Sequence, residues 1–215
     1  MPLMIMKRKH IITISGKPGS GKSSTADKLA ELLEYTRYSS GDYIREFLRT
    51  KNITLSEYNK QATINKDLDN YIDQKLRSLR SQNDIIIDSR LGFYWIPESF
   101  KVYLDLDIDV ATARIFSNIT ENKKRSEMEN PNRSLTTVAR QVKERMLSEQ
   151  KRFIKMYHVD PYEKSYFDLI IDTSRQTPQS VAIIIFDYYK KWLNSDNWQQ
   201  KKYNLPIGYS LDRKF

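Results

Sequence analysis

The residues best suited to chemistry in this 215-residue chain form a short glycine-rich segment near its beginning. The segment matches the G-x-x-x-x-G-K-[ST] pattern of a phosphate-binding loop, or P-loop, at every required position. Its members are Gly16, Lys17, Pro18, Gly19, Ser20, Gly21, Lys22 and Ser23, and the predicted nucleotide-binding stretch extends to Ser24. The pattern predicts binding of a nucleoside triphosphate, but it does not specify the acceptor of a transferred group.

Each residue type in this segment has a physical reason. Glycines let the backbone curl, so that successive N–H groups point at phosphate oxygens. The side chain of Lys22 can reach the β- and γ-phosphates, and the hydroxyl of Ser23 can bind Mg²⁺. The alternative is a glycine-rich turn that happens to precede a helix, and the complete match makes it the weaker interpretation.

The flanking residues predict a strand before the loop and a helix after it. Residues 11–14 form a short β-branched run, which is typical of a buried strand. Ala26, Leu29, Ala30 and Leu33 follow the loop at i, i+3, i+4 and i+7, which is the spacing of one helical face. A helix that begins at the loop would add its positive dipole end to the phosphate site.

Five short runs predict the strands of the whole chain, at residues 11–14, 36–39, 85–87, 102–106 and 169–171. Helical stretches separate them, so the order indicates βαβ units and a parallel sheet with helices on both faces. We therefore predict an α/β protein, and 215 residues suffice for one well-buried domain.

The composition narrows the possible environment and partners. The chain has no cysteine, so disulfides and thiolate metal sites are excluded. We find no apolar stretch of signal-peptide or membrane-spanning length, and we expect a cytoplasmic protein without membrane association. The net charge is +9, which favours a partner rich in phosphate.

Most of the net positive charge lies between residues 114 and 155, where eleven basic residues stand against five acids. A pair of nucleotides or a nucleic acid would match this charge. Residues 118–134 are polar and predict a mobile flap or a plain solvated loop. An apolar stripe then predicts a long helix, on which Arg145 and Arg152 could face a cleft or water.

The last segment, residues 194–215, is basic and aromatic, with few aliphatic side chains. We expect it to be a strap packed on the domain. The alternative is an arm that stacks single-stranded bases.

Several short runs in order resemble the nucleoside monophosphate kinases, and more narrowly the archaeal-type cytidylate kinases, over about residues 9–187. The P-loop is followed by Ser40-Gly41-Asp42 with Arg45 one helical turn on, then by Leu68-Asp69 and Ile72-Asp73. Ile85 to Arg90 and the run from Tyr166 to Ser174 complete the pattern. The chain departs from it at Ser89, where the family often has glycine, and at Asn118, where it often has arginine.

The resemblance implies a P-loop kinase domain over residues 1–193, with ATP as donor, Mg²⁺ as cofactor and CMP or dCMP as the expected acceptor. It further implies a helical acceptor-binding insertion at 42–82 and a basic lid at 118–134. One alternative is a kinase for AMP, UMP, dTMP or a nucleic-acid 5′-hydroxyl. Another is a nucleotide-dependent nucleic-acid-binding protein without turnover. We expect a monomer or a weak homo-oligomer.

The same resemblance suggests roles for the charged residues. Arg45 and Arg90 would clamp the acceptor phosphate, because the planar fork of arginine suits a bidentate grip. Surface salt bridges are the alternative for both. The predicted catalytic residues, which would offset charge that develops during transfer, are Lys22, Arg114, Arg145 and Arg152. For the three arginines, a solvated helix face is the competing interpretation.

Each of the acidic residues near the predicted site has more than one possible role. Asp88 would end a buried strand, where it could join Ser23 at the metal or could orient Arg90 or Lys22. Asp42 is predicted at the acceptor site, with a helix N-cap as the alternative. Asp73 lies four residues after Asp69 on one helix face, where both could read an amine of cytosine or simply face water.

Overall fold

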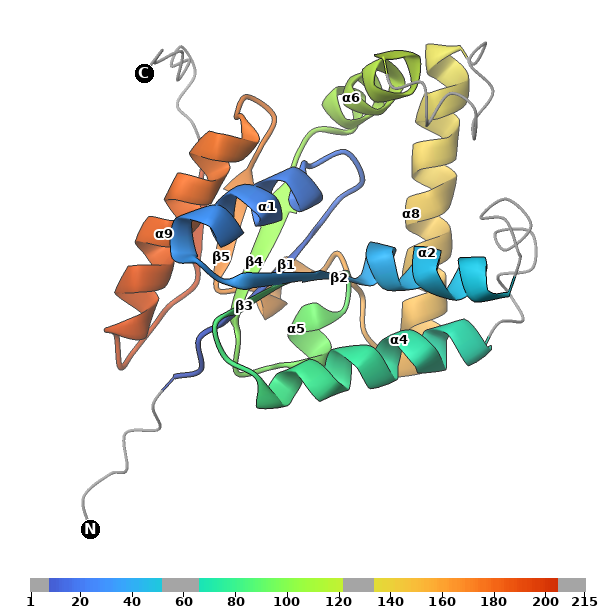
Figure 1. The fold of residues 1–215 in the computed structure, drawn as a ribbon. Helices are drawn as coiled ribbons and strands as arrows, with labels where there is room; N and C mark the ends of the chain where they lie inside the picture. Colours follow the sequence, from blue (N-terminus) through green and yellow to red (C-terminus); the bar gives the residue numbers. More distant parts are fainter. Residues whose placement is uncertain (1–7, 52–65, 122–133, 205–215) are drawn as a thin grey trace.

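The computed structural model describes residues 8–51, 66–121 and 134–204, and its centre is a parallel sheet (Figure 1). The strand order is β2-β3-β1-β4-β5-β6. The strands are β1 (Ile11–Gly16), β2 (Thr36–Ser39), β3 (Ile85–Asp88), β4 (Phe100–Asp105), β5 (Leu169–Asp172) and β6 (Lys201–Tyr203). Every pairing is parallel, as the βαβ pattern predicts.

The sixth strand corrects the prediction of five. β6 is short and carries two lysines, so it has no apolar run of the kind that marks a buried strand. It pairs with β5, and Leu169 lies opposite Lys201. Just before it, Trp198 donates from Nε1 to the Asp168 carbonyl at 3.2 Å. The described part of the predicted strap is therefore built into the sheet, and residues 205–215 lie outside the described residues.

Alternating side chains on the strands serve two cores. On one face, α1 (Lys22–Leu33) and α9 (Pro178–Leu193) cover a cluster that includes Ile12 and Ile14. On the other face, Tyr103 and Ile170 contact the segment around α5 (Gly92–Trp95) and the end of α8 (Leu135–Tyr157). The parallel sheet is thus covered on both sides, as predicted for an α/β protein.

The two segments expected to hold the acceptor and the lid extend from this core (Figure 1). The first contains α2 (Ser40–Thr50), α4 (Lys66–Ser78) and the 3-10 turn η1 (Leu79–Ser81). Leu48 of α2 and Leu68 of α4 are both buried in one cluster. This part of the insertion is helical, as expected, and residues 52–65 lie outside the described residues.

The helices α6 (Ile108–Glu121) and α8 flank the expected lid. Ser134 caps α8 by accepting from the Thr137 N–H at 3.2 Å, and Val138 and Val142 pack against α6. The long helix predicted after the polar segment is confirmed. The lid itself falls largely on residues 122–133, outside the described residues. In the described part of the chain, no helix is long and apolar enough to cross a membrane.

Candidate functional site

The backbone of the P-loop requires its glycines. Gly16 has φ of 143°, and a Cβ there would lie 2.2 Å from the Leu104 carbonyl oxygen of the neighbouring strand. Gly21 has φ of 80° and stands immediately before α1, which begins at Lys22. The first N–H groups of α1 therefore point into the loop, where they can bind phosphate oxygens.

Lys22 is the charged centre of the loop. Its Nζ donates to the carbonyls of Gly16 at 3.1 Å and Lys17 at 3.0 Å. Burial lowers the pKa of Lys22 well below its usual range, and Arg90 adds to this shift while Asp88 and Glu149 oppose it. Charged groups from several elements therefore act on one lysine, which is typical of functional sites.

Two oxygen donors stand together beside Lys22. The Ser23 hydroxyl donates to Oδ2 of Asp88 at 2.6 Å, and Asp88 is only 5% exposed at the end of β3. A hydroxyl and a carboxylate are ligand types that Mg²⁺ accepts. The described residues hold no cluster of three or more His, Asp or Glu side chains that could bind a metal alone. Ser23 and Asp88 thus fit a Mg²⁺ that takes its remaining ligands from phosphates and water.

Arg37 is a residue of this site that the sequence reasoning missed. It lies on β2, and its Nη2 approaches Oδ2 of Asp88 at 3.3 Å. Its Nε is 3.2 Å from Asp27, and its Nη1 is 3.5 Å from Asp42. No motif contains Arg37, because only the pairing of β2 with β3 brings it beside Asp88.

Asp42 and Arg45 lie together in the first turns of α2. Arg45 donates from Nη2 to Asp42, and the side chain of Arg45 is 69% exposed. Ser39, not Asp42, is the N-cap residue of α2, so the N-cap interpretation of Asp42 is wrong. Arg45 is free enough from the core to turn toward a ligand, while Asp42 holds it at the surface.

Arg90 follows β3 and is buried against α8. Its Nε donates to Oε2 of Glu149 at 2.8 Å, and its side chain is 14% exposed. Glu149 also accepts from Nε of Arg145 at 2.9 Å and from the Tyr162 hydroxyl at 2.8 Å. Burial raises the pKa of Glu149, but Arg90 and Arg145 together hold it well below the usual range of a carboxyl. Arg90, Arg145 and Lys22 are thus brought together.

The other two predicted arginines have different surroundings. Nη1 of Arg152 lies 3.2 Å from Oδ1 of Asp69, which joins α8 to α4. Nη2 of Arg114 donates to the Thr173 carbonyl at 2.7 Å and to the Ser174 carbonyl at 3.3 Å. Arg114 therefore holds the loop between β5 and α9, and neither arginine is simply a solvated helix face.

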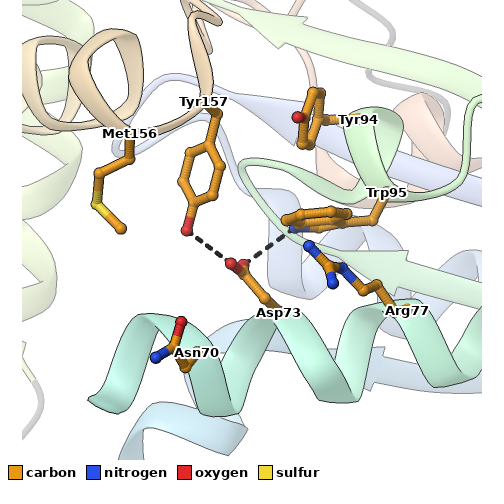
Figure 2. Close-up of a pocket in the computed structure, with 7 residues that line it drawn as sticks. All are labelled: Asn70, Asp73, Arg77, Tyr94, Trp95, Met156 and Tyr157. Atoms are coloured by element: carbon orange, nitrogen blue, oxygen red, sulfur yellow. Dashed lines mark hydrogen bonds between the residues drawn. The ribbon is translucent and has the colours of Figure 1, made fainter. Parts of the chain in front are cut away.

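A pocket of about 510 Å³ lies where α4, α5 and the end of α8 meet (Figure 2). Asp73 stands in it and accepts from Trp95 Nε1 at 3.1 Å and from the Tyr157 hydroxyl at 2.8 Å. The Arg77 guanidinium lies 4.0 Å from the centre of the Trp95 ring. The lining residues are Asn70, Asp73, Arg77, Tyr94, Trp95, Met156 and Tyr157. These rings and polar edges suit a flat, polar ligand.

These arrangements define a class of protein. A P-loop at the carboxyl edge of a parallel sheet, with arginines and a carboxylate around its lysine, is the architecture of a P-loop nucleotide kinase. A model of the cytidylate kinase-like family matches residues 11–175, and the chain belongs to that family. The resemblance to archaeal-type nucleoside monophosphate kinases is thus confirmed.

Individual relatives and structures agree with this assignment. The cytidylate kinase of Natronomonas pharaonis is 33% identical over 178 residues, which are 81% of this chain and 86% of that protein. That of Sulfurisphaera tokodaii is 34% identical over 181 residues, which are 83% and 94% of the two chains. The shikimate kinase structure from Bacteroides thetaiotaomicron has a TM-score of 0.56 at 11% identity, covers 86% of this chain and 98% of that one, and shows the shared fold.

Proposed function

We propose that this protein transfers the γ-phosphoryl group of ATP to a nucleoside monophosphate, with CMP or dCMP as the preferred acceptor. The products are ADP and the nucleoside diphosphate. The observation that carries the proposal is the P-loop together with two contacts beside it, Ser23 to Asp88 at 2.6 Å and Arg90 to Glu149 at 2.8 Å. Phosphoryl transfer needs in-line positioning and fixed positive charge, and Lys22 and Arg90 would supply the charge.

On the donor side, the P-loop amides would hold the β-phosphate, and Lys22 would bridge the β- and γ-phosphates. Lys22 now donates to two loop carbonyls, and phosphate oxygens would replace these partners. Ser23 and Asp88 would hold Mg²⁺, whose chemistry is to neutralise charge on the phosphates. Arg37 would keep the Asp88 carboxylate turned toward Ser23.

On the acceptor side, Arg90 and Arg45 would grip the monophosphate from β3 and α2. Arg90 is fixed by its ion pair, whereas Arg45 is exposed and can move onto the ligand. Arg145 would offset charge that develops on the transferred group. Arg152 acts through Asp69 in keeping α8 and α4 together, and Arg114 acts through the β5–α9 loop.

Two observations support a preference for cytosine, and the first is the stronger. The first is membership of a family whose relatives include proteins named cytidylate kinase. The second is the aromatic pocket beside Asp73, whose rings could stack on a pyrimidine. Each Asp73 oxygen accepts one hydrogen bond from the protein, which would fix the carboxylate in the pocket and leave a second lone pair on each oxygen for a base amine.

The test is a panel of acceptors. ADP formation from ATP and Mg²⁺ is followed with CMP, dCMP, UMP, AMP and dTMP, each over a range of concentrations. The proposal expects the highest kcat/KM for CMP or dCMP, because a site built for one base leaves polar groups unpaired with another. A clear preference for AMP or dTMP would reject the cytosine assignment and keep the kinase. No transfer to any of these monophosphates would reject the proposed function.

A further inference from the structure

One carboxylate, that of Glu149, collects three donors from three parts of the chain. Oε2 accepts from Arg90 Nε at 2.8 Å and from the Tyr162 hydroxyl at 2.8 Å. Oε1 accepts from Arg145 Nε at 2.9 Å. The Glu149 side chain is only 16% exposed, so these donors largely replace the water that an ionised carboxylate requires.

The two arginines differ in how firmly the rest of the protein holds them. Arg90 is 14% exposed at the end of β3, whereas Arg145 is 65% exposed on α8. Arg145 and Glu149 are one helical turn apart, so this contact fixes the direction of an otherwise free side chain. Both arginines contact Glu149 through Nε, which is not part of the end-on fork formed by the two Nη groups. That fork is the part that grips phosphate oxygens in pairs.

The charges explain why a carboxylate is needed there. Arg90, Arg145 and Lys22 are three cations gathered around one small site, and their mutual repulsion would drive the exposed Arg145 toward solvent. Among the described charged groups that act on Lys22, Asp88 and Glu149 are those that offset this repulsion. Asp88 serves Ser23 and Arg37 on the donor side. Glu149 is left to serve the acceptor side.

We infer that Glu149 is a positioning residue: it aligns the guanidinium groups of Arg90 and Arg145, from two separate elements, on the acceptor phosphate. This inference rests on the proposed transfer to a monophosphate and adds a residue to its site. Because Glu149 lies on α8, it also ties the helix that follows the expected lid to the turn after β3, where Arg90 lies. Tyr162 also holds this carboxylate, through its hydroxyl.

The experiment compares Glu149→Gln with Glu144→Gln, a matched control. Glu144 lies on the same helix, is 62% exposed and lies 4.0 Å from Arg140, which is itself exposed. Each change removes one negative charge from α8. We expect Glu149→Gln to raise the KM for CMP roughly tenfold or more and to lower kcat. The reason is that the neutral glutamine would make weaker hydrogen bonds to Arg90 and Arg145 than the carboxylate does. The Kd of ATP, measured by calorimetry, should stay within about twofold, and Glu144→Gln should match the wild type.

A double-mutant cycle separates positioning from a general structural role. In the Arg90→Met background, Glu149→Gln should raise the KM for CMP much less than it does alone, because one target of the alignment is gone. Full additivity of the two changes would overturn the inference. So would equal behaviour of Glu149→Gln and Glu144→Gln, or parallel losses of ATP and CMP binding.

A milder variant covers the case in which Glu149→Gln does not fold. Tyr162→Phe keeps all the charges and removes one hydrogen bond to Oε2. It should raise the KM for CMP severalfold with ATP binding unchanged, and an unchanged KM would then overturn the inference. If the wild type transfers phosphate to no monophosphate, the proposed function fails. If the wild type is active and these variants match it, only the role of Glu149 fails.

Discussion

At the scale of residues, the site depends on which groups the fold brings to Lys22. The P-loop could be predicted in full, because its chemistry lies in eight consecutive positions. Asp88 and Arg90 could also be predicted, since one ends a recognisable strand and the other closely follows it. Arg37 and Glu149 could not, because their partners lie 51 and 59 residues away in the sequence. Their importance comes from tertiary contacts that no local pattern encodes.

Arg90→Lys tests the acceptor assignment at this scale. Lysine keeps the positive charge but loses the planar fork, so we expect the Kd of CMP to rise roughly tenfold or more. The Kd of ATP should hardly change, because the donor is held by the P-loop. Calorimetry with each nucleotide separately would measure both values. Equal losses for the two nucleotides would mean that Arg90 serves the donor or the fold.

At the scale of elements, the predictable parts were those with strong periodicity. The apolar stripe that starts at Leu135 predicts a long helix, and α8 runs from Leu135 to Tyr157. The strand β6 was not predictable, because its three residues are polar and its place depends on pairing with β5. The junction of α4, α5 and α8 was not predictable either, since Asp73 meets Trp95 and Tyr157 only after folding.

Asp73→Asn tests whether the ionised Asp73 side chain lowers the stability of the protein at this junction. Burial raises the pKa of Asp73 above its ordinary value, although its two donors and nearby arginines oppose the shift. The ionised carboxylate therefore costs stability above the folded-state pKa, and this cost disappears as the pH falls through that pKa toward about 3.9. The Tm difference, variant minus wild type, should decrease from pH 7 to pH 4.5.

The control for this prediction is Asp67→Asn, on the same helix but at an exposed position of its first turn. Asp67 is exposed, so the Asp67→Asn variant should show no gain in Tm at pH 7. A Tm difference for Asp73→Asn that grows as the pH falls would contradict the prediction that the ionised Asp73 carboxylate lowers the stability of the fold. It would mean that the ionised form is the one that the junction stabilises.

At the scale of the whole molecule, a net charge of +9 is compatible with either nucleotides or nucleic acid. The described part of the basic stretch favours nucleotides, because several of its arginines are paired within the chain. Arg145 contacts Glu149, Arg152 contacts Asp69, and Arg140 lies 4.0 Å from Glu144. Paired cations release fewer counterions on binding a polyanion than a continuous basic surface would.

A salt titration of oligonucleotide binding tests this point. We expect weak binding of single-stranded DNA or RNA. A plot of the logarithm of the binding constant against the logarithm of the salt concentration should have a shallow slope, between about −0.7 and −1.4, as for one or two contacted phosphates. Fluorescence anisotropy with a labelled 20-mer would measure it, with ATP and CMP added as competitors. Tight binding with a steep slope that neither nucleotide reduces would favour the nucleic-acid-binding alternative.

The central claim is that the protein moves the γ-phosphoryl group of ATP to CMP. Its most direct test follows the label from γ-³²P-ATP in single-turnover reactions with Mg²⁺ and CMP, separating the nucleotides by chromatography. We predict that the label appears in CDP, that Lys22→Ala slows its appearance roughly a hundredfold or more, and that Lys28→Ala, an exposed lysine of α1, does not. Label released as inorganic phosphate without labelled CDP, or labelled CDP formed equally well by Lys22→Ala, would contradict the account.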